Sequence, residues 1–404
     1  MLVLAGGDLV LPDRILPGAS LAIDDARIVA IEERTRIDSP GVTVVEVPGC
    51  YVVPGFIDVH VHGVDGYDTL DEGDPVARIA SRLPRYGVTG FCPTTVACGP
   101  HALRTVLSQV AAARAARPAT SARVLPAHLE SNFINPDYGG AQPAECLRLP
   151  PSAEVAHHVR KGDFSARDIL DTITAARPDV GIVTLAPELP GGIELVRALV
   201  SAGHRVSLGH SGASLDEAMA AIDAGARHAT HLFNRMTPMT HRAPGVAGAV
   251  LTRDEVAAEL ICDGYHVHPA MSRMAIASKG VGRIMAITDG TGGSGLSVGS
   301  SARLGGRRIR VTEHAAVLED GTLAGSTLTM DRAFRTIVTA FGCSVVDAAR
   351  ICSTTPAREL GLTGFGVLAA GAFADCVVLD RELRVVRTFI DGQEAYVKEG
   401  ATVR

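Results

Sequence analysis

The stretch Tyr51–Gly63, YVVPGFIDVHVHG, ends an apolar run with two histidines one residue apart. Side chains of a strand alternate between its two faces, so His60 and His62 point to the same side, as does Asp58. One histidine near a core is usually a satisfied structural residue, whereas two on one strand face are harder to explain in that way. On this stretch alone, a metal site and a structural role both stay open.

After this strand, the sequence alternates between two kinds of segment. Short apolar runs rich in β-branched residues are separated by alanine-rich segments of helical period, such as GASLDEAMAAIDAGA at 212–226. This alternation is typical of βα units on a parallel sheet. The expected strands are Val52–His62, Val88–Thr95, Arg123–Glu130, Val180–Glu188, Arg205–His210, His228–His231, Val256–Asp263 and Arg283–Asp289. Eight such units over roughly 300 residues favour an α/β fold of the (β/α)₈ TIM-barrel type over an open sheet.

The two ends of the chain have a different character. Residues 1–50 form short alternating runs punctuated by Gly, Asp and Pro, and residues 366–404 repeat that pattern. Neither segment is long enough to close a stable sheet alone, so we expect them to meet in one small β-domain. The predicted division is 1–53 and 363–404 for the β-domain and 54–362 for the barrel.

Composition and charge narrow the function classes. The chain has 404 residues, of which 47% are hydrophobic and 20% charged, as in ordinary globular enzymes. A net charge of −6 without a long basic run argues against a nucleic-acid partner, although a few local arginines can still bind a small phosphate. No apolar run reaches the roughly 18–20 residues of a membrane helix, and the first residues lack the basic start of a signal peptide. Eight scattered cysteines without a CxxC pair predict reduced thiols and a cytoplasmic location.

Potential metal ligands stand at the ends of several expected strands. They are His60, His62, Glu130, His210, His231 and Asp289. Each has a structural interpretation when taken singly, because a histidine can be a core residue and Asp289 can cap a turn. In a TIM-type barrel, however, the carboxyl ends of the strands converge, which brings all six to one cavity. Imidazoles and carboxylates together predict Zn²⁺ or a similar divalent ion, with an open position for water.

The other histidines carry less weight. His128 shares a strand face with Glu130 and is expected in the core or behind the ligands. The remaining ones are expected to be surface or structural residues, and they include His101, His157, His158, His204 and His314.

Several blocks of sequence, spread over nearly the whole chain, are specific enough to suggest a family. They include PGFIDVHVHG, TLAPE, VSLGHS, HATHLFNRMTPMTHRAPG and GTLAGSTLTMDRA. Together they resemble the N-acetylglucosamine-6-phosphate deacetylase family of the amidohydrolase superfamily. The resemblance implies hydrolysis of the N-acetyl group of an amino-sugar phosphate by metal-activated water, yielding glucosamine 6-phosphate and acetate. It also implies one or two divalent ions, most often zinc with iron, manganese or cobalt as alternatives, and a homodimer.

The resemblance assigns roles to individual residues. Glu130, His210 and His231 would hold the principal ion. The pair His60 and His62 matches the HxH motif that supports a second ion in some members. Asp289 matches the general acid/base, which also contacts metal, and His266 matches the residue that polarises the substrate carbonyl. The residues that match sugar-phosphate contacts or line the pocket are Ala141, Gln142, Asn234, Arg235, Arg242, Leu323, Ala324 and Gly325.

Two departures from the family pattern flank the expected metal site. Ser131 and Asn132 replace a Gly-Pro pair, and the glycine-rich run Gly290–Gly295 replaces alanine and a bulky residue. They leave the shape of the acyl or sugar pocket open, so N-acetylgalactosamine 6-phosphate or an unphosphorylated N-acyl sugar is the alternative substrate.

Other reactions fit the sequence less well. Cyclic-amide hydrolases of the superfamily commonly use a carboxylated lysine at the end of strand four, but none of the three lysines ends a strand. Deaminases typically lack the glutamate of strand three. A non-catalytic protein on a degenerate barrel should have lost ligands, whereas all of them are present here.

Overall fold

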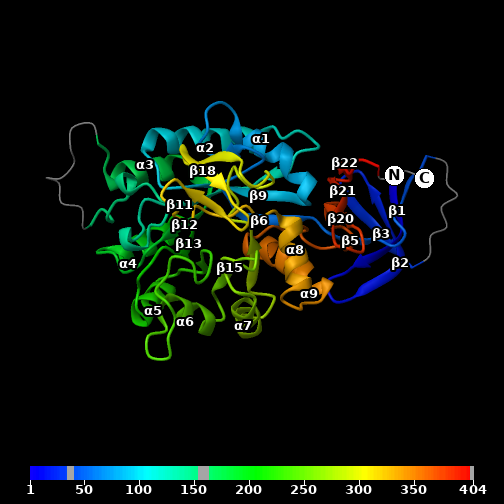
Figure 1. Ribbon diagram of the computed structural model, residues 1–404. Coiled ribbons are helices and arrows are strands. Elements are labelled where there is room, and N and C mark those ends of the chain that lie inside the picture. The colour runs from blue at the N-terminus through cyan, green and yellow to red at the C-terminus, as the bar shows by residue number, and fades with distance from the viewer. Residues whose placement is uncertain (34–40, 153–162, 401–404) are drawn as a thin grey trace.

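The computed structural model describes residues 1–33, 41–152 and 163–400, which form a helix-covered barrel and a β-domain at one end (Figure 1). Strands from both terminal segments form the β-domain, and they run in the order β22-β21-β20-β5-β1-β2-β3, with β4 beside β1. These strands are β1 (Leu2–Val10), β2 (Ile15–Asp24), β3 (Arg27–Glu32), β4 (Thr43–Glu46), β5 (Tyr51–Pro54), β20 (Cys376–Leu379), β21 (Val385–Ile390) and β22 (Gln393–Val397). The prediction that the two termini share one small β-domain is confirmed.

Strand β5 links the two terminal segments. It pairs in parallel with β1 and antiparallel with β20, so the N-terminal and C-terminal strands become one sheet. Alternate side chains of these strands, such as Leu4, Leu21, Val52 and Phe389, form a core separate from that of the barrel. The limits 53/54 and 362/363 given above for the domains stay a prediction.

The barrel strands pair in parallel throughout. They are β6 (Phe56–Val61), β9 (Val88–Thr95), β11 (Ala127–Glu130), β12 (Val180–Leu185), β13 (Arg205–Leu208), β14 (His228–Ala229), β15 (Ala257–Ile261) and β16 (Ile284–Ile287). A bridge between Val61 and Gly290, and a 2.9 Å hydrogen bond from the Asp289 amide to the His60 carbonyl, close the ring between the last strand and the first. The predicted (β/α)₈ barrel is confirmed, and its closure places Asp289 beside His60.

Two expected strands are divided in the structure. Val52–His62 is not one barrel strand, because its first half is β5 of the β-domain and only β6 belongs to the barrel. The break falls at Gly55, where an added Cβ would lie 2.2 Å from Oγ1 of Thr89, so the chain crosses there without a side chain. Arg123–Glu130 is likewise divided into β10 (Arg123–Val124) and β11, with Pro126 between them. Proline has no amide hydrogen to give to a ladder.

Helices cover the outside of the barrel (Figure 1). They are α1 (Pro75–Arg82), α2 (Pro100–Ala115), α3 (Ala166–Ala175), α4 (Gly192–Ser201), α5 (Leu215–Asp223), α6 (Gly245–Thr252), α7 (Pro269–Lys279), α8 (Met330–Thr339), α9 (Val345–Ala349) and α10 (Thr355–Glu359). Short 3₁₀ helices span Leu83–Tyr86, Pro136–Tyr138, Ala144–Cys146 and Arg177–Asp179, and a π-helical turn spans Arg350–Thr354. Ser214 begins α5 with a capping box, in which its hydroxyl and the Glu217 carboxylate bond each other's backbone amides.

A small insertion that the sequence analysis did not anticipate follows the last barrel strand. It is the antiparallel sheet of β17 (Ser301–Leu304), β18 (Arg307–Val311) and β19 (Ala316–Leu318), and a two-stranded ribbon of β7 (Gly63–Val64) and β8 (Tyr67–Asp68) lies at the end of β6. The sheet packs Leu304 and Ile309 against Val96. It therefore forms one wall at the carboxyl end of the barrel.

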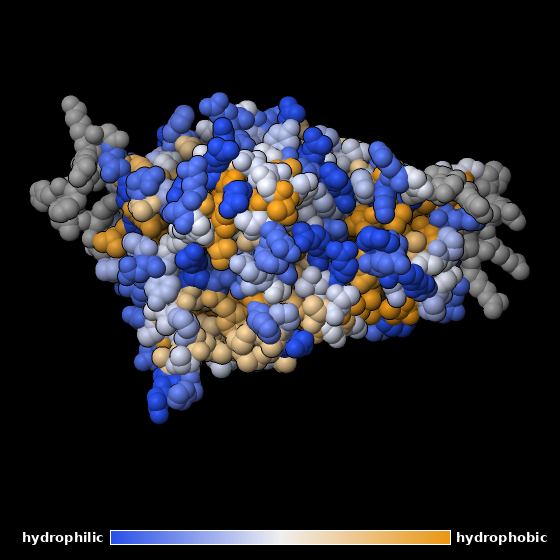
Figure 2. Space-filling model, viewed as in Figure 1, coloured by the Kyte–Doolittle hydropathy of each residue, from blue (hydrophilic) through white to orange (hydrophobic). Residues whose placement is uncertain are grey.

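Hydrophilic residues cover most of the face shown in Figure 2, and apolar residues gather in separate areas. Among the described helices, none combines the length and the apolar character needed to cross a membrane. All eight cysteines are free thiols, as predicted. His101 and His314 are exposed, His204 is buried, and His157 and His158 lie outside the described residues.

Candidate active site

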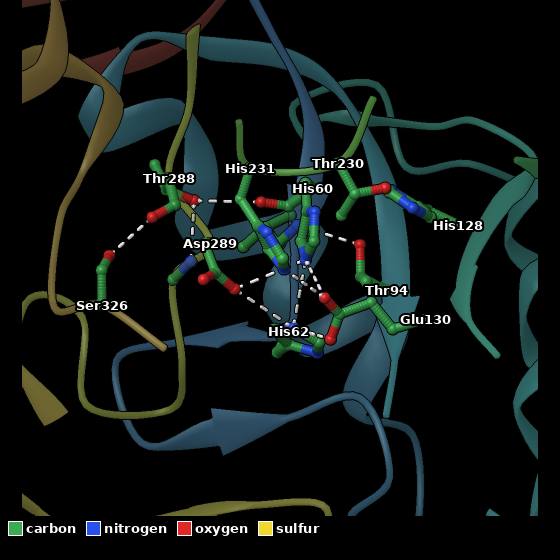
Figure 3. Close-up of polar contacts among 12 residues, drawn as sticks. His60, His62, Thr94, His128, Glu130, Thr230, His231, Thr288, Asp289 and Ser326 are labelled. Atoms are coloured by element: carbon green, nitrogen blue, oxygen red, sulfur yellow. Dashed lines mark hydrogen bonds and ion pairs between the residues drawn. The ribbon is translucent and has the colours of Figure 1, made fainter. Parts of the chain in front are cut away.

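The six predicted ligand residues meet at the carboxyl ends of the barrel strands, and Figure 3 shows five of them, His60, His62, Glu130, His231 and Asp289. All six side chains are buried. His210, His231 and Asp289 have positive φ angles of 48°, 30° and 47°, which non-glycine residues seldom adopt. At these positions the chain turns sharply as the strand ends and directs the side chain into the barrel mouth. Such backbone strain is common where a side chain has to be aimed.

One group of donors consists of Glu130, His210 and His231. Oε1 of Glu130 lies 3.0 Å from Nε2 of His210 and 2.9 Å from Nε2 of His231, and the two nitrogens are 3.1 Å apart. Burial alone would raise the pKa of Glu130, but the two imidazoles hold it well below its usual value. His210 also places Nδ1 2.8 Å from the Tyr138 carbonyl. That bond keeps its proton on Nδ1 and leaves Nε2 free for a metal ion.

A second group consists of His60, His62 and Asp289. The Nε2 atoms of the two histidines are 3.3 Å apart, and Oδ1 of Asp289 lies 3.4 Å from Nε2 of His60 and 3.3 Å from Nε2 of His62. Burial lowers the pKa of His60 to about 4, so this imidazole is neutral near pH 7. Burial also opposes the charge on Asp289, but its hydrogen bond with His62 holds the pKa of the carboxyl below its usual value. Burial opposes the charge on His62, but its hydrogen bonds with Asp289 and Glu130 raise its pKa to about 10, so a metal ion would have to displace a proton from this imidazole.

Glu130 lies between the two groups. Its Oε1 is 3.6 Å from Nε2 of His60, and its Oε2 is 3.4 Å from Nε2 of His62. Gln142 donates a 2.5 Å hydrogen bond from Nε2 to the same Oε2, while its own Oε1 accepts the amide of Ala97 at 2.7 Å. Each group of three offers ligand atoms within 4.8 Å of one another. The donor set thus fits a divalent ion in either group, with Glu130 in reach of both.

An open cavity of about 600 Å³ lies against these donors. Its remaining walls come from Val96, Ala141, Gln142, Asn234, Arg235, His266, Leu304, Leu323 and Gly325. Ala324 and Arg242, which the resemblance places at the pocket, are not among the described residues that line this cavity. Ala324 is fully buried, and Arg242 is exposed in the loop before α6.

His266 enters the cavity from the segment after β15. Its Nδ1 lies 2.6 Å from Oδ2 of Asp263, whose Oδ1 accepts the amides of Tyr265 and His266 at 2.8 and 2.9 Å. Burial opposes protonation of the imidazole, but the hydrogen bond and charge of Asp263 raise the pKa of His266 above its ordinary value. The bond at Nδ1 leaves Nε2 as a donor for a ligand in the cavity.

Arg235 lies at the mouth of the cavity. Its φ is +50°, and an added Cβ at Gly140 would lie only 2.5 Å from its Nε. Gly140 therefore leaves the space in which the guanidinium lies across the loop that carries Ala141. Because Arg235 is exposed and Asn234 beside it is half-buried, the cavity has a positively charged, hydrogen-bonding rim.

The two departures from the family pattern are parts of the framework around the donors. Ser131 donates its hydroxyl to the Thr184 carbonyl at 2.6 Å, and Asn132 donates to the carbonyls of Cys98 and Cys146 at 2.9 and 2.7 Å. The carbonyl of Gly290 accepts the amides of His62 and Gly63 at 2.8 and 2.9 Å. These bonds tie the loops to the barrel and leave the metal donors intact.

Two buried carboxylates behind the donors complete the site. Asp58 accepts the hydroxyl of Thr288 at 2.5 Å and so joins β6 to the residue that follows β16. Glu259 on β15 lies 3.0 Å from Nδ1 of His60, and the sequence analysis did not identify it. Burial raises the pKa of both carboxyls to about 7. A signal was present, because Glu259 is an acidic residue inside the apolar run VAAELIC at 256–262.

His128 is not directed at the donors. Its Nδ1 lies 3.0 Å from the Val59 carbonyl and its Nε2 lies 2.8 Å from the Thr184 hydroxyl, so both nitrogens are used in the core. This agrees with its predicted place behind the ligands.

Comparisons with known proteins agree with this geometry. The sequence profile of the amidohydrolase family matches residues 51–395. N-acetylglucosamine-6-phosphate deacetylase of Bacillus subtilis is 34% identical over 97% of this chain and 96% of its own, and the human enzyme is 37% identical over 99% and 95%. N-acetylgalactosamine-6-phosphate deacetylase of Escherichia coli O157:H7 is 35% identical over 97% and 99%. A mutant deacetylase from Mycobacterium smegmatis, solved in complex with N-acetyl-D-glucosamine-6-phosphate, is 32% identical with a TM-score of 0.86 over 98% of this chain and 99% of its own.

Proposed function

This chain belongs to the amidohydrolase family, and on that premise we propose that it removes the N-acetyl group of N-acetylglucosamine 6-phosphate, releasing glucosamine 6-phosphate and acetate. The observation that carries the proposal is the meeting of Asp289, Glu130 and four histidines at the carboxyl ends of the strands, five of which line one cavity with a basic rim. Relatives of that name match over nearly the full length, and a structural neighbour binds this sugar phosphate.

We propose that Glu130, His210 and His231 hold a principal divalent ion and that His60 and His62 support a second one. Zinc is the proposed ion, with iron, manganese or cobalt as alternatives. Such an ion lowers the pKa of water to about 7 and polarises a carbonyl oxygen. The protein contributes the fixed donors: Tyr138 and Gln142 orient His210 and Glu130 before any ligand arrives.

Asp289 is the proposed general acid/base. Its pKa is held low, so near neutral pH its carboxylate is free to take a proton from the attacking water. The same carboxyl then returns that proton to the leaving amine, which completes the cleavage of the amide bond. Two observations support this role: Asp289 lines the cavity, and its Oδ1 lies 3.3 Å from Nε2 of His62.

His266 is proposed to stabilise the substrate oxygen as negative charge develops on it. Asp263 fixes Nδ1 and favours the protonated imidazole, so Nε2 donates toward the cavity. A donor prepositioned in this way stabilises the transition state without reorganising during the reaction.

Asn234, Arg235 and Arg242 are proposed to contact the sugar phosphate. A guanidinium is well suited to phosphate because its planar N–H groups form paired hydrogen bonds. Arg235 is the arginine at the cavity rim, whereas the role of Arg242 rests on the resemblance. Because one relative is an N-acetylgalactosamine-6-phosphate deacetylase, the 4-epimer is the second proposed substrate.

The test is acetate release from N-acetylglucosamine 6-phosphate by the zinc-loaded protein, before and after treatment with a chelator. The proposal expects release that the chelator abolishes and added zinc restores. Absence of release from the loaded protein would contradict it. We also propose a cytoplasmic location, supported by the eight free thiols, and a homodimer, supported by the resemblance.

A further inference from the structure

Glu259 lies directly behind a metal donor. It is fully buried on β15, and its Oε2 lies 3.0 Å from Nδ1 of His60, on the side of the imidazole opposite the cavity. The same oxygen lies 3.4 Å from the backbone nitrogen of His231. The carboxylate thus contacts one residue from each of the two donor groups.

The protonation of His60 follows from these contacts. Its Nε2 faces Nε2 of His62 at 3.3 Å and Oδ1 of Asp289 at 3.4 Å, the position of a ligand atom. A ligating nitrogen needs a free lone pair, so the proton of the neutral ring must be on Nδ1. Oε2 of Glu259 is the acceptor for that proton.

His128 also lies near Glu259 but is not the hydrogen-bond partner of its carboxylate. Nδ1 of His128 lies 3.7 Å from Oε1 of Glu259, but it is 3.0 Å from the Val59 carbonyl, which takes its proton. Within the described chain, Oε1 of Glu259 has no hydrogen-bond partner. Leaving a buried polar atom unpaired costs stability. Of the two contacts that Oε2 makes with the donor groups, the bond to His60 is the shorter, and it is the one that reaches a ligand side chain.

We propose that Glu259 is a positioning residue for the ion held by His60, His62 and Asp289. It fixes the tautomer and the ring orientation of His60 and thereby sets the affinity of that half of the site. The inference rests on the proposed function in that it requires a bound divalent ion. Loss of a carboxylate partner behind a ligating histidine typically weakens metal binding 10–100-fold.

The experiment compares zinc binding by the wild-type protein, Glu259→Leu and Thr184→Val. Zinc per chain is measured after reconstitution, and affinity is measured by titration against a chelator. The wild type is expected to bind two ions, and Glu259→Leu is expected to keep one and to bind the other about 100-fold more weakly. Thr184→Val is the matched control, because it removes a buried hydroxyl that bonds His128 and Thr230 and, within the described chain, bonds none of the proposed ligands. It is expected to keep both ions at wild-type affinity.

If Glu259→Leu does not fold, Glu259→Gln tests the role of Glu259 in its place. Its amide oxygen can still accept the proton of His60 but carries no charge, so the second ion should bind about 10-fold more weakly. Wild-type affinity for both ions in every folded Glu259 variant would overturn the inference and leave the proposed function standing. The inference would also be overturned if the wild type bound a single ion and the Glu259 variants retained that ion. A wild-type protein that binds no ion would instead contradict the proposed function.

Discussion

Oδ1 of Asp289, just beyond the last strand of the barrel, lies 3.3 Å from Nε2 of His62, just beyond the first. The backbone that closes the barrel produces this contact, because the Asp289 amide donates to the His60 carbonyl and the His62 amide donates to the Gly290 carbonyl. The proposed acid/base is therefore held beside the metal donors by main-chain bonds. Its position does not depend on a ligand in the cavity.

Replacing Asp289 by asparagine should keep the fold and remove the proton transfer. The main-chain bonds remain, whereas the amide cannot accept a proton from water, so kcat should fall by roughly 10²–10⁴. Steady-state kinetics with zinc-saturated protein measures the effect, and metal content measured on the same samples is the control. A variant that keeps more than about half of the wild-type kcat would place the acid/base elsewhere.

The two donor groups should lose metal separately. Glu130→Gln removes the carboxylate that contacts His210 and His231, so the principal ion should be lost. The double variant His60→Gln/His62→Asn should retain that ion and lose the other. Elemental analysis of the reconstituted variants distinguishes the two sites. A metal-free double variant beside a fully loaded Glu130→Gln would reverse the assignment.

Asp263 should set the alkaline limit of activity. Its hydrogen bond raises the pKa of His266, so protonated His266 is present below that pKa and is lost as the pH rises through it. Asp263→Asn removes the charge, so the pKa should fall and the alkaline limb of the kcat/KM profile should move to lower pH. Rate profiles of the two proteins on one substrate measure the shift. An unchanged alkaline limb would exclude His266 as the titrating group.

Arg235 is expected to contact only the phosphate of the substrate. Arg235→Ala is expected to lower kcat/KM for the phosphorylated sugar about tenfold, the effect of a contact worth about 1.4 kcal/mol, with little change for the unphosphorylated sugar. Arg197→Ala on α4 is the matched control, because that arginine is 63% exposed and does not line the cavity. Equal losses on both sugars would make Arg235 a structural residue.

Arg242 is tested in the same way. The resemblance predicts a selective loss on the phosphorylated sugar for Arg242→Ala, measured by kcat/KM on the same two sugars. Wild-type kinetics on both would confine the phosphate contact to the residues that line the cavity.

The sequence was most informative where side-chain chemistry coincides with strand ends. The six ligand residues could be predicted to meet because the carboxyl ends of parallel barrel strands converge, whereas their division into two groups followed from the resemblance. Glu259 was missed because its place inside an apolar run marks it as unusual but does not indicate which residue it contacts. Its role becomes visible only in the folded barrel, where Glu259 on β15 meets His60 on β6, although the two strands are not neighbours in the sheet.

Local backbone geometry also could not be predicted from the sequence. The strand-like pattern of Val52–His62 continues on both sides of Pro54-Gly55, so its periodicity does not show that the chain crosses there between two sheets. Arg235 and Arg242 lie in a loop without regular period, and the φ of +50° at Arg235 turns its side chain to the cavity rim. Sequence could therefore suggest both arginines as phosphate contacts without separating the one that lines the cavity.

The most direct test of the central claim is a comparison of kcat/KM for acetate release by the zinc-loaded protein on N-acetylglucosamine 6-phosphate, its 4-epimer and unphosphorylated N-acetylglucosamine. The account predicts the highest value for N-acetylglucosamine 6-phosphate, at least about tenfold above the unphosphorylated sugar, with one amine formed per acetate. No acetate release from any of the three, or an outright preference for the unphosphorylated sugar, would contradict it.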